Sequence, residues 1–157
     1  MGVGKSTTGD ALAAELGWEH ADSDRDIEML TGRSGADIAA EHGVPRLHQI
    51  EAAVLLGALA RPAPCVVSAA ASTVEDAIVR DALARRAFVA RLLAPAEDVL
   101  ARQLDGGHRR PMSREEYDEL AERREPFFEA VEDLRLDATQ PTAALVDAIH
   151  RQIQRDL

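Results

Sequence analysis

The sequence has almost no cysteine and no long apolar run. Among the 157 residues there is one cysteine, Cys65, so the chain cannot form an internal disulfide or a thiolate metal cluster. Cys65 lies in a short apolar run, where a small buried hydrophobic side chain is its simplest role. No stretch approaches the ~18 apolar residues of a membrane-spanning helix, and we expect no signal peptide. We therefore expect a cytoplasmic protein in a reducing setting, without a membrane partner.

Positive charge is also scarce, and lysine is scarcer still. The formal net charge is −10 at pH 7, which opposes binding to nucleic acid or to an anionic membrane. An anionic ligand must therefore be held by a focused site. Of the 18 basic residues, all but Lys5 are arginine. A lone lysine indicates that a compact, flexible ammonium group is needed at that position.

This lysine lies in the second half of a phosphate-binding loop. The run Gly-x-Gly-Lys-Ser-Thr leads into a helical pattern over residues 6–16, and its members are Gly2, Val3, Gly4, Lys5, Ser6 and Thr7. In such a loop backbone N–H groups surround phosphate oxygens, the lysine reaches the outer phosphates, and the next hydroxyl binds Mg²⁺. An ordinary glycine-rich helix entry is the alternative interpretation.

The loop pattern begins too late to be whole. The full motif needs a glycine five residues before Gly4, and a hydrophobic strand before that. Both positions lie before Met1, so we expect translation to start upstream and to supply the first central strand of the sheet. The intact mass of the natural protein tests this expectation.

The rest of the chain alternates between strand and helix patterns. Short apolar or extended runs predict strands at 18–21, 65–68, 88–92 and 134–136, and the run at 65–68 is expected to be buried on both faces. Periodicity and capping signals predict helices at 6–16, 24–30, 35–42, 45–60, 74–85, 95–104, 114–124 and 126–132, followed by a terminal helix. This order predicts one α/β domain over 1–157, a three-layer, doubly wound parallel sheet of P-loop NTPase type that apparently lacks its first central strand. We expect a monomer.

Two carboxylates follow the first predicted strand. Asp22 and Asp24 lie at its carboxyl end, where open α/β sheets bind ligands. Residues i and i+2 of an extended segment point the same way, so both side chains are expected to face the phosphate loop. A solvated turn or a helix N-cap is the alternative interpretation. Further along, a glycine-led basic loop at about 105–115 is expected to form a lid.

The order of these features resembles the shikimate kinases, which transfer the γ-phosphoryl group of ATP to a hydroxyl of shikimate. The resemblance runs nearly end to end. Beside the phosphate loop, its narrower pieces are Asp22-Ser23-Asp24, Thr31-Gly32-Arg33-Ser34-x-Ala36-Asp37-Ile38, Arg110-Pro111 and Arg124-x-Pro126.

The resemblance implies a role for each matching residue. Lys5 would hold the β- and γ-phosphates, and Ser6 with Asp22 would hold Mg²⁺. Asp24 would contact the acceptor hydroxyls and take a proton, and Arg110 would neutralise charge on the transferred phosphoryl group. Gln140 and Pro141 match the loop that touches adenine, and Arg124 matches an arginine that grips the acceptor's carboxylate. The alternatives are a solvated loop charge for Arg110, a surface ion-pair run for Arg124 and a polar loop residue for Gln140.

The acceptor side departs from the family pattern in two places. His48 stands where the family has a second carboxylate-gripping arginine, and a half-exposed helix histidine is the alternative interpretation. Ala70, Ala71 and Ser72 stand where the family has three glycines, so we expect the pocket floor to be reshaped. The implied substrate-binding residues are Asp24, His48, Ala70, Ala71, Ser72 and Arg124. A shikimate kinase is the first expectation. A kinase of another small polyol or sugar-like acceptor, and a nucleotide-binding protein without catalysis, are the alternatives.

Overall fold

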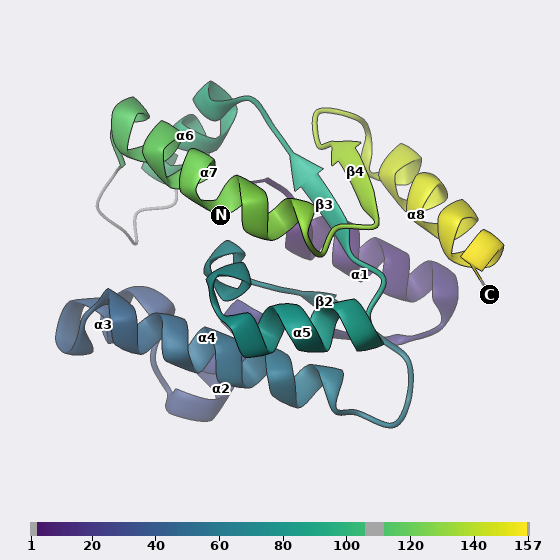
Figure 1. The fold of residues 1–157 in the computed structure, drawn as a ribbon, viewed down its shortest axis with the longest axis horizontal. Helices are drawn as coiled ribbons and strands as arrows, with labels where there is room; N and C mark the ends of the chain where they lie inside the picture. Colours follow the sequence, from purple (N-terminus) through teal and green to yellow (C-terminus); the bar gives the residue numbers. More distant parts are fainter. Residues whose placement is uncertain (1–2, 106–111, 157) are drawn as a thin grey trace.

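The computed structural model describes residues 3–105 and 112–156 (Figure 1). In chain order the elements are α1 (Lys5–Leu16), β1 (Glu19–Asp22), α2 (Ser23–Thr31), α3 (Gly35–His42), α4 (Val44–Leu59), β2 (Cys65–Ser68), the 3₁₀ helix η1 (Ala71–Glu75), α5 (Ala77–Arg86), β3 (Ala90–Leu93), α6 (Ala96–Asp105), α7 (Arg114–Glu129), β4 (Leu134–Asp137) and α8 (Thr142–Asp156). No helix in these two ranges is both long enough and apolar enough to cross a membrane.

The strands form two parallel pairs. β1 pairs with β2 from Glu19 opposite Cys65 to Asp22 opposite Ser68, so both strands end at the same edge. β3 pairs with β4 in the same parallel sense. Within the described residues β2 and β3 do not pair with each other, and each has one strand neighbour. Cys65, Val66 and Val67 are accordingly half-buried, which corrects the expectation of a fully buried strand.

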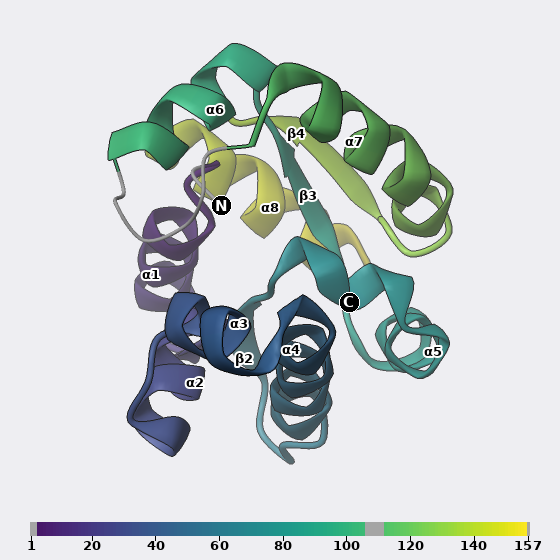
Figure 2. The same cartoon turned by 90° about the vertical axis from the view of Figure 1, so that its left-hand side faces the viewer.

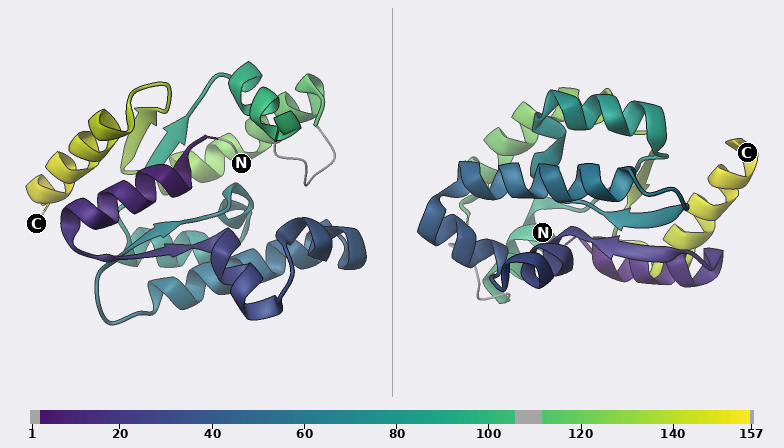
Figure 3. Two further views of the ribbon diagram at one scale, coloured as in Figure 1. Left: turned by 180° about the vertical axis from the view of Figure 1, so that it is seen from behind. Right: turned by 90° about the horizontal axis from the view of Figure 1, so that it is seen from below.

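Helices cover both sides of the strands and give three layers. On one side α1 and α8 lie along each other, as the view from behind shows (Figure 3), and their buried Leu12 and Ile149 pack with Val66 of β2. On the other side Leu55 of α4 and Val79 of α5 pack with Val67. Neighbouring residues of a strand point to opposite faces, so Val66 and Val67 join two separate cores. The predicted three-layer arrangement is confirmed.

A third apolar cluster joins the helices beside β1. Ile27 of α2, Ile38 of α3 and Leu47 of α4 are all buried against one another. Figure 2 shows these three helices grouped at one end of the molecule. The side chain of Ser34 starts α3 through a reciprocal capping box with Asp37. The segment after the first strand is therefore a packed helical unit attached to the sheet.

The structure corrects the boundaries around Pro126. The sequence predicted separate helices at 114–124 and 126–132, but α7 is continuous from Arg114 to Glu129 with Pro126 inside it. An interior proline costs about 3 kcal/mol because it removes a hydrogen bond and crowds the preceding turn. The next two residues, Phe127 and Phe128, pack against the core of α4 and α5, and this burial offsets the cost. Likewise, α5 begins at Ala77 rather than 74, because Asp76 caps it after the 3₁₀ turn.

Candidate active site

The phosphate loop turns into α1 at a left-handed glycine. Gly4 has φ of 91° and ψ of 17°, a conformation that suits glycine because it has no Cβ. No side chain of the described residues caps this end of α1. The first backbone N–H groups of a helix have no acceptor inside the helix, and they favour an anion. The loop geometry is therefore that of an anion-binding helix start with Lys5 in its first turn.

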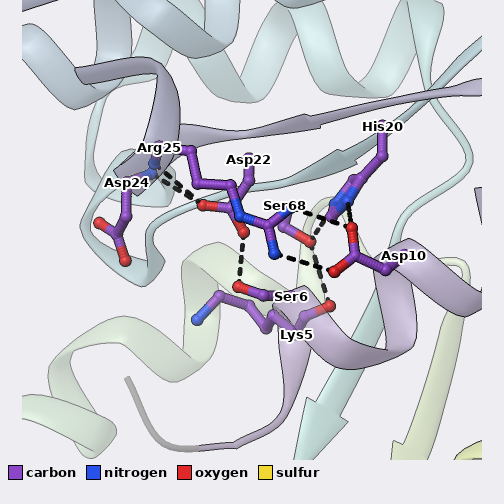
Figure 4. Close-up of polar contacts among 8 residues, drawn as sticks. All are labelled: Lys5, Ser6, Asp10, His20, Asp22, Asp24, Arg25 and Ser68. Carbon is purple, nitrogen blue, oxygen red and sulfur yellow. Dashed lines mark hydrogen bonds and ion pairs between the residues drawn. The ribbon is translucent and has the colours of Figure 1, made fainter. Parts of the chain in front are cut away.

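Ser6 and Asp22 meet directly in front of this helix start (Figure 4). The Ser6 hydroxyl donates to Oδ2 of Asp22 at 2.5 Å. The other oxygen, Oδ1, accepts from the backbone N–H groups of Asp24 at 3.0 Å and Arg25 at 3.3 Å, so Asp22 also caps α2. Asp22 is buried. A hydroxyl and a carboxylate oxygen are hard ligands of the kind that Mg²⁺ prefers.

Asp24 does not follow the geometry expected of it. α2 begins at Ser23, directly after β1, so Asp22-Ser23-Asp24 is a strand-to-helix junction rather than an extended segment. Residues two apart in a helix point about 200° apart. Asp24 is exposed, and Figure 4 shows its carboxylate apart from the Ser6–Asp22 contact. The argument that Asp22 and Asp24 share one face was therefore wrong, and the N-cap interpretation is correct for Asp22.

A chain of polar contacts that the sequence did not predict fastens α1 to both strands. Arg25 holds both oxygens of Asp10, at 3.0 and 2.8 Å. Asp10 lies 2.6 Å from Nδ1 of His20, and Nε2 of His20 lies 2.9 Å from the Ser68 hydroxyl. That hydroxyl donates to the backbone carbonyl of Lys5 at 3.1 Å. The hydrogen bonds from Arg25 and then His20 hold the pKa of Asp10 well below its usual range.

The Ser–His–Asp order of these contacts is that of a nucleophilic triad, but the chemistry does not fit. Ser68 is only 7% exposed, and its hydroxyl is directed at the Lys5 carbonyl rather than at an open cleft. The contacts therefore position the residues that follow the phosphate loop. The one available sequence signal was Gly9, because a glycine inside a helical pattern costs stability and usually has a packing reason. A Cβ at Gly9 would meet the side chains of His20 and Ser68.

On the acceptor side, the alanine-rich loop does not need glycine. Ala70 has φ of −67° and ψ of 140°, and η1 starts at Ala71. No described residue other than glycine has a positive φ. Ser72 is buried and donates to Glu51, which is itself only 3% exposed on α4. His48 lies one turn before Glu51 on α4 and is half-buried.

Arg124 lies in the charged run Glu122-Arg123-Arg124-Glu125, but it is neither solvated nor paired with a residue of that run. Its side chain is 12% exposed, and Nε donates to Oε1 of Glu75 at 2.5 Å. Nη2 of Arg123 reaches the same oxygen at 3.3 Å. Burial opposes ionisation of Glu75, but the hydrogen bonds from Arg124 and Arg123 outweigh it and lower the pKa of Glu75. The alternative of a surface ion-pair run is therefore wrong about the partner, because Glu75 comes from η1.

Comparison with known proteins identifies the family. The model of the family described as shikimate kinase matches residues 1–154. The chain belongs to the shikimate kinase family. The shikimate kinase of Chromobacterium violaceum is 33% identical over 150 residues, covering 93% of this chain and 81% of that protein. The shikimate kinase of Mycobacterium tuberculosis is 37% identical over 144 residues, covering 88% of this chain and 80% of that protein.

Solved structures agree with the family. A shikimate kinase from Acinetobacter baumannii in complex with shikimate matches with a TM-score of 0.84 and 28% identity, covering 99% of this chain and 89% of that one. The Aquifex aeolicus shikimate kinase, at 22% identity, also gives a TM-score of 0.84 over 99% of this chain and 93% of that one. The predicted α/β fold of P-loop type is confirmed by these likenesses.

Other predicted residues of the shikimate kinase pattern lie apart or cannot be placed. Gly2, Arg110 and most of the predicted lid fall outside the described residues. Gln140 and Pro141 form an exposed loop between β4 and α8. A hollow of about 380 Å³ lies at the carboxyl ends of β3 and β4, but it includes neither of them; its lining is Leu93, Ala94, Pro95, Arg135, Leu136 and Asp137. The predicted adenine contacts of Gln140 and Pro141 stay predictions.

Proposed function

We propose that this protein transfers the γ-phosphoryl group of ATP to a hydroxyl of shikimate, within one domain spanning residues 1–157. The observation that carries the proposal is the contact between Ser6 and Asp22 beside the phosphate loop of Lys5. The family and its named members support shikimate as the acceptor. We expect the working protein to be a monomer, which light scattering after size exclusion would check.

Ser6 and Asp22 are the residues that would hold Mg²⁺. Within the described residues no group of three or more His, Cys, Asp and Glu side chains could hold a metal. Two protein ligands suffice for Mg²⁺, because it usually keeps several waters and binds substrate phosphates. When bound, the ion neutralises charge on the β- and γ-phosphates. Lys5 and the loop N–H groups of Val3, Gly4, Ser6 and Thr7 would orient the same phosphates.

The acceptor would be held by residues that face the ATP phosphates from the opposite side of the site. Arg124 would grip its carboxylate, with His48 and the loop of Ala70, Ala71 and Ser72 around it. Asp24 would accept the proton of the attacking hydroxyl, and its exposure leaves it open to the acceptor. Arg110 would stabilise the transferred group from the lid, with Gln140 and Pro141 against adenine.

A coupled assay of ADP release tests this function. Wild-type protein with Mg²⁺ and ATP should release ADP in proportion to added shikimate, and Lys5→Met should abolish that release. A panel of neutral cyclic polyols and sugars tests the second candidate, which His48 favours because it replaces a carboxylate-gripping arginine. Turnover on the panel without turnover on shikimate would replace the proposed acceptor, and no acceptor-dependent release would reject kinase activity.

A further inference from the structure

The guanidinium assigned to the acceptor's carboxylate already holds a carboxylate of this chain. Arg124 is on α7, and Glu75 lies 49 residues earlier at the end of η1. The contact from Nε to Oε1 is 2.5 Å, and the two side chains are only 12% and 28% exposed. A partly buried, charged hydrogen bond of this kind is stronger than a surface ion pair.

The backbone around Glu75 is held so that its carboxylate faces α7. Arg80 of α5 donates to the carbonyls of Val74 at 2.7 Å and Glu75 at 2.9 Å. The same guanidinium lies 4.4 Å from the centre of the Phe127 ring on α7. Val74 is buried in the core of α4 and α5. Glu75 is therefore a fixed group at the end of the loop that begins with the acceptor residues Ala70 and Ala71.

We propose that Glu75 is a specificity-determining residue, whose carboxylate competes with an acceptor carboxylate for Arg124. The inference rests on the proposed function, which assigns Arg124 to the acceptor. An anionic acceptor must displace Glu75 from Nε or bind beside its negative charge, whereas a neutral polyol meets no such competition. With histidine at position 48, the site favours carboxylate acceptors only weakly over neutral ones of the same shape.

The test compares shikimate with its methyl ester, which has the same hydroxyls and no charge. Glu75→Gln should lower KM for shikimate about tenfold, and leave KM for the ester and for ATP within about twofold. Glu75→Asp withdraws the carboxylate by one methylene and should act in the same direction, more weakly. Glu119→Gln, at an exposed position of α7, is the matched control and should change nothing.

Calorimetric binding of shikimate to each variant separates this proposal from the proposed function. Competition stands if Glu75→Gln binds shikimate about tenfold more tightly, whether or not turnover is seen. It is overturned if shikimate is turned over but KM and binding are unchanged. A rise in KM for shikimate would overturn it too, because Glu75 would then orient Arg124 for the acceptor. An equal change in KM for shikimate and for its ester would also overturn it. If no variant binds shikimate or turns it over, both proposals are overturned.

Discussion

Nε2 of His20 lies 2.9 Å from the hydroxyl oxygen of Ser68, and that hydroxyl also reaches the Lys5 carbonyl at 3.1 Å. A carbonyl can only accept, so the Ser68 hydroxyl is the donor in its contact with Lys5. The Asp10 carboxylate on the other side of the ring also accepts. His20 thus lies between the Asp10 carboxylate and the Ser68 hydroxyl, with one ring nitrogen facing each of them. β1 and β2 are thereby tied to the first turn of α1.

Replacing Gly9 by alanine should break this arrangement. A Cβ at Gly9 would lie 2.4 Å from Nε2 of His20 and 2.6 Å from the Ser68 hydroxyl, which is closer than real contacts allow. We expect the free energy of unfolding to fall by roughly 2 kcal/mol, as for overpacked sites. Gly57→Ala is the control, because Gly57 is on α4 with nothing within 4 Å. It should stabilise by about 0.5–1 kcal/mol, since alanine favours helix. Urea unfolding measures both, and equal effects would show that no close approach exists at Gly9.

Asp10 should make stability depend on pH in acid. Hydrogen bonds from Arg25 and His20 lower its pKa from the ordinary 3.8, so the folded state favours the ionised form. A lowered folded-state pKa gives stability that is full above the unfolded-state pKa and is lost as pH falls through the folded-state pKa. Between about pH 5 and pH 2, Asp10→Asn should therefore lose less stability than wild type. Asp147→Asn, on the exposed side of α8, is the control. If the free energies of unfolding of wild type and Asp10→Asn fall in parallel as the pH is lowered, the hydrogen bonds of Asp10 with Arg25 and His20 do not stabilise the fold.

The sequence predicted the fold and part of the site, but it did not predict the side-chain contacts between distant residues. Periodicity and turn residues predicted the fold, and the place of Asp22 at the carboxyl end of a strand predicted that it would face the phosphate loop. The pairing of Asp22 with Ser6 was implied only by the resemblance to the shikimate kinases. Asp24 was misplaced because helix α2 starts one residue after the strand, which alternation cannot reveal. The pairing of Glu75 with Arg124 joins residues 49 apart through a 3₁₀ turn. No local pattern encodes such a contact.

Asp22 combines two roles that substitution can separate. Its Oδ1 caps α2 and its Oδ2 contacts Ser6. Asparagine is also a good N-cap, so Asp22→Asn should change the free energy of unfolding little, yet lower kcat roughly 100-fold by weakening Mg²⁺ binding. Asp22→Ala should lose activity and, in addition, about 1 kcal/mol of stability. Titration of activity with Mg²⁺ and thermal unfolding check the two effects. Full activity of Asp22→Asn at low Mg²⁺ would remove Asp22 from the metal site.

His48 offers the complementary test of the acceptor side. An arginine there should restore a bidentate, charged grip, so His48→Arg should lower KM for shikimate roughly five- to tenfold while kcat and KM for ATP stay the same. His42→Arg adds the same charge at the exposed end of α3 and controls for long-range attraction in a chain of net charge −10. Combined with Glu75→Gln, the gains should be less than multiplicative, because both changes act on one carboxylate. If His48→Arg leaves KM for shikimate unchanged while Glu75→Gln lowers it, His48 does not face the acceptor, and Glu75 alone sets the grip on its carboxylate.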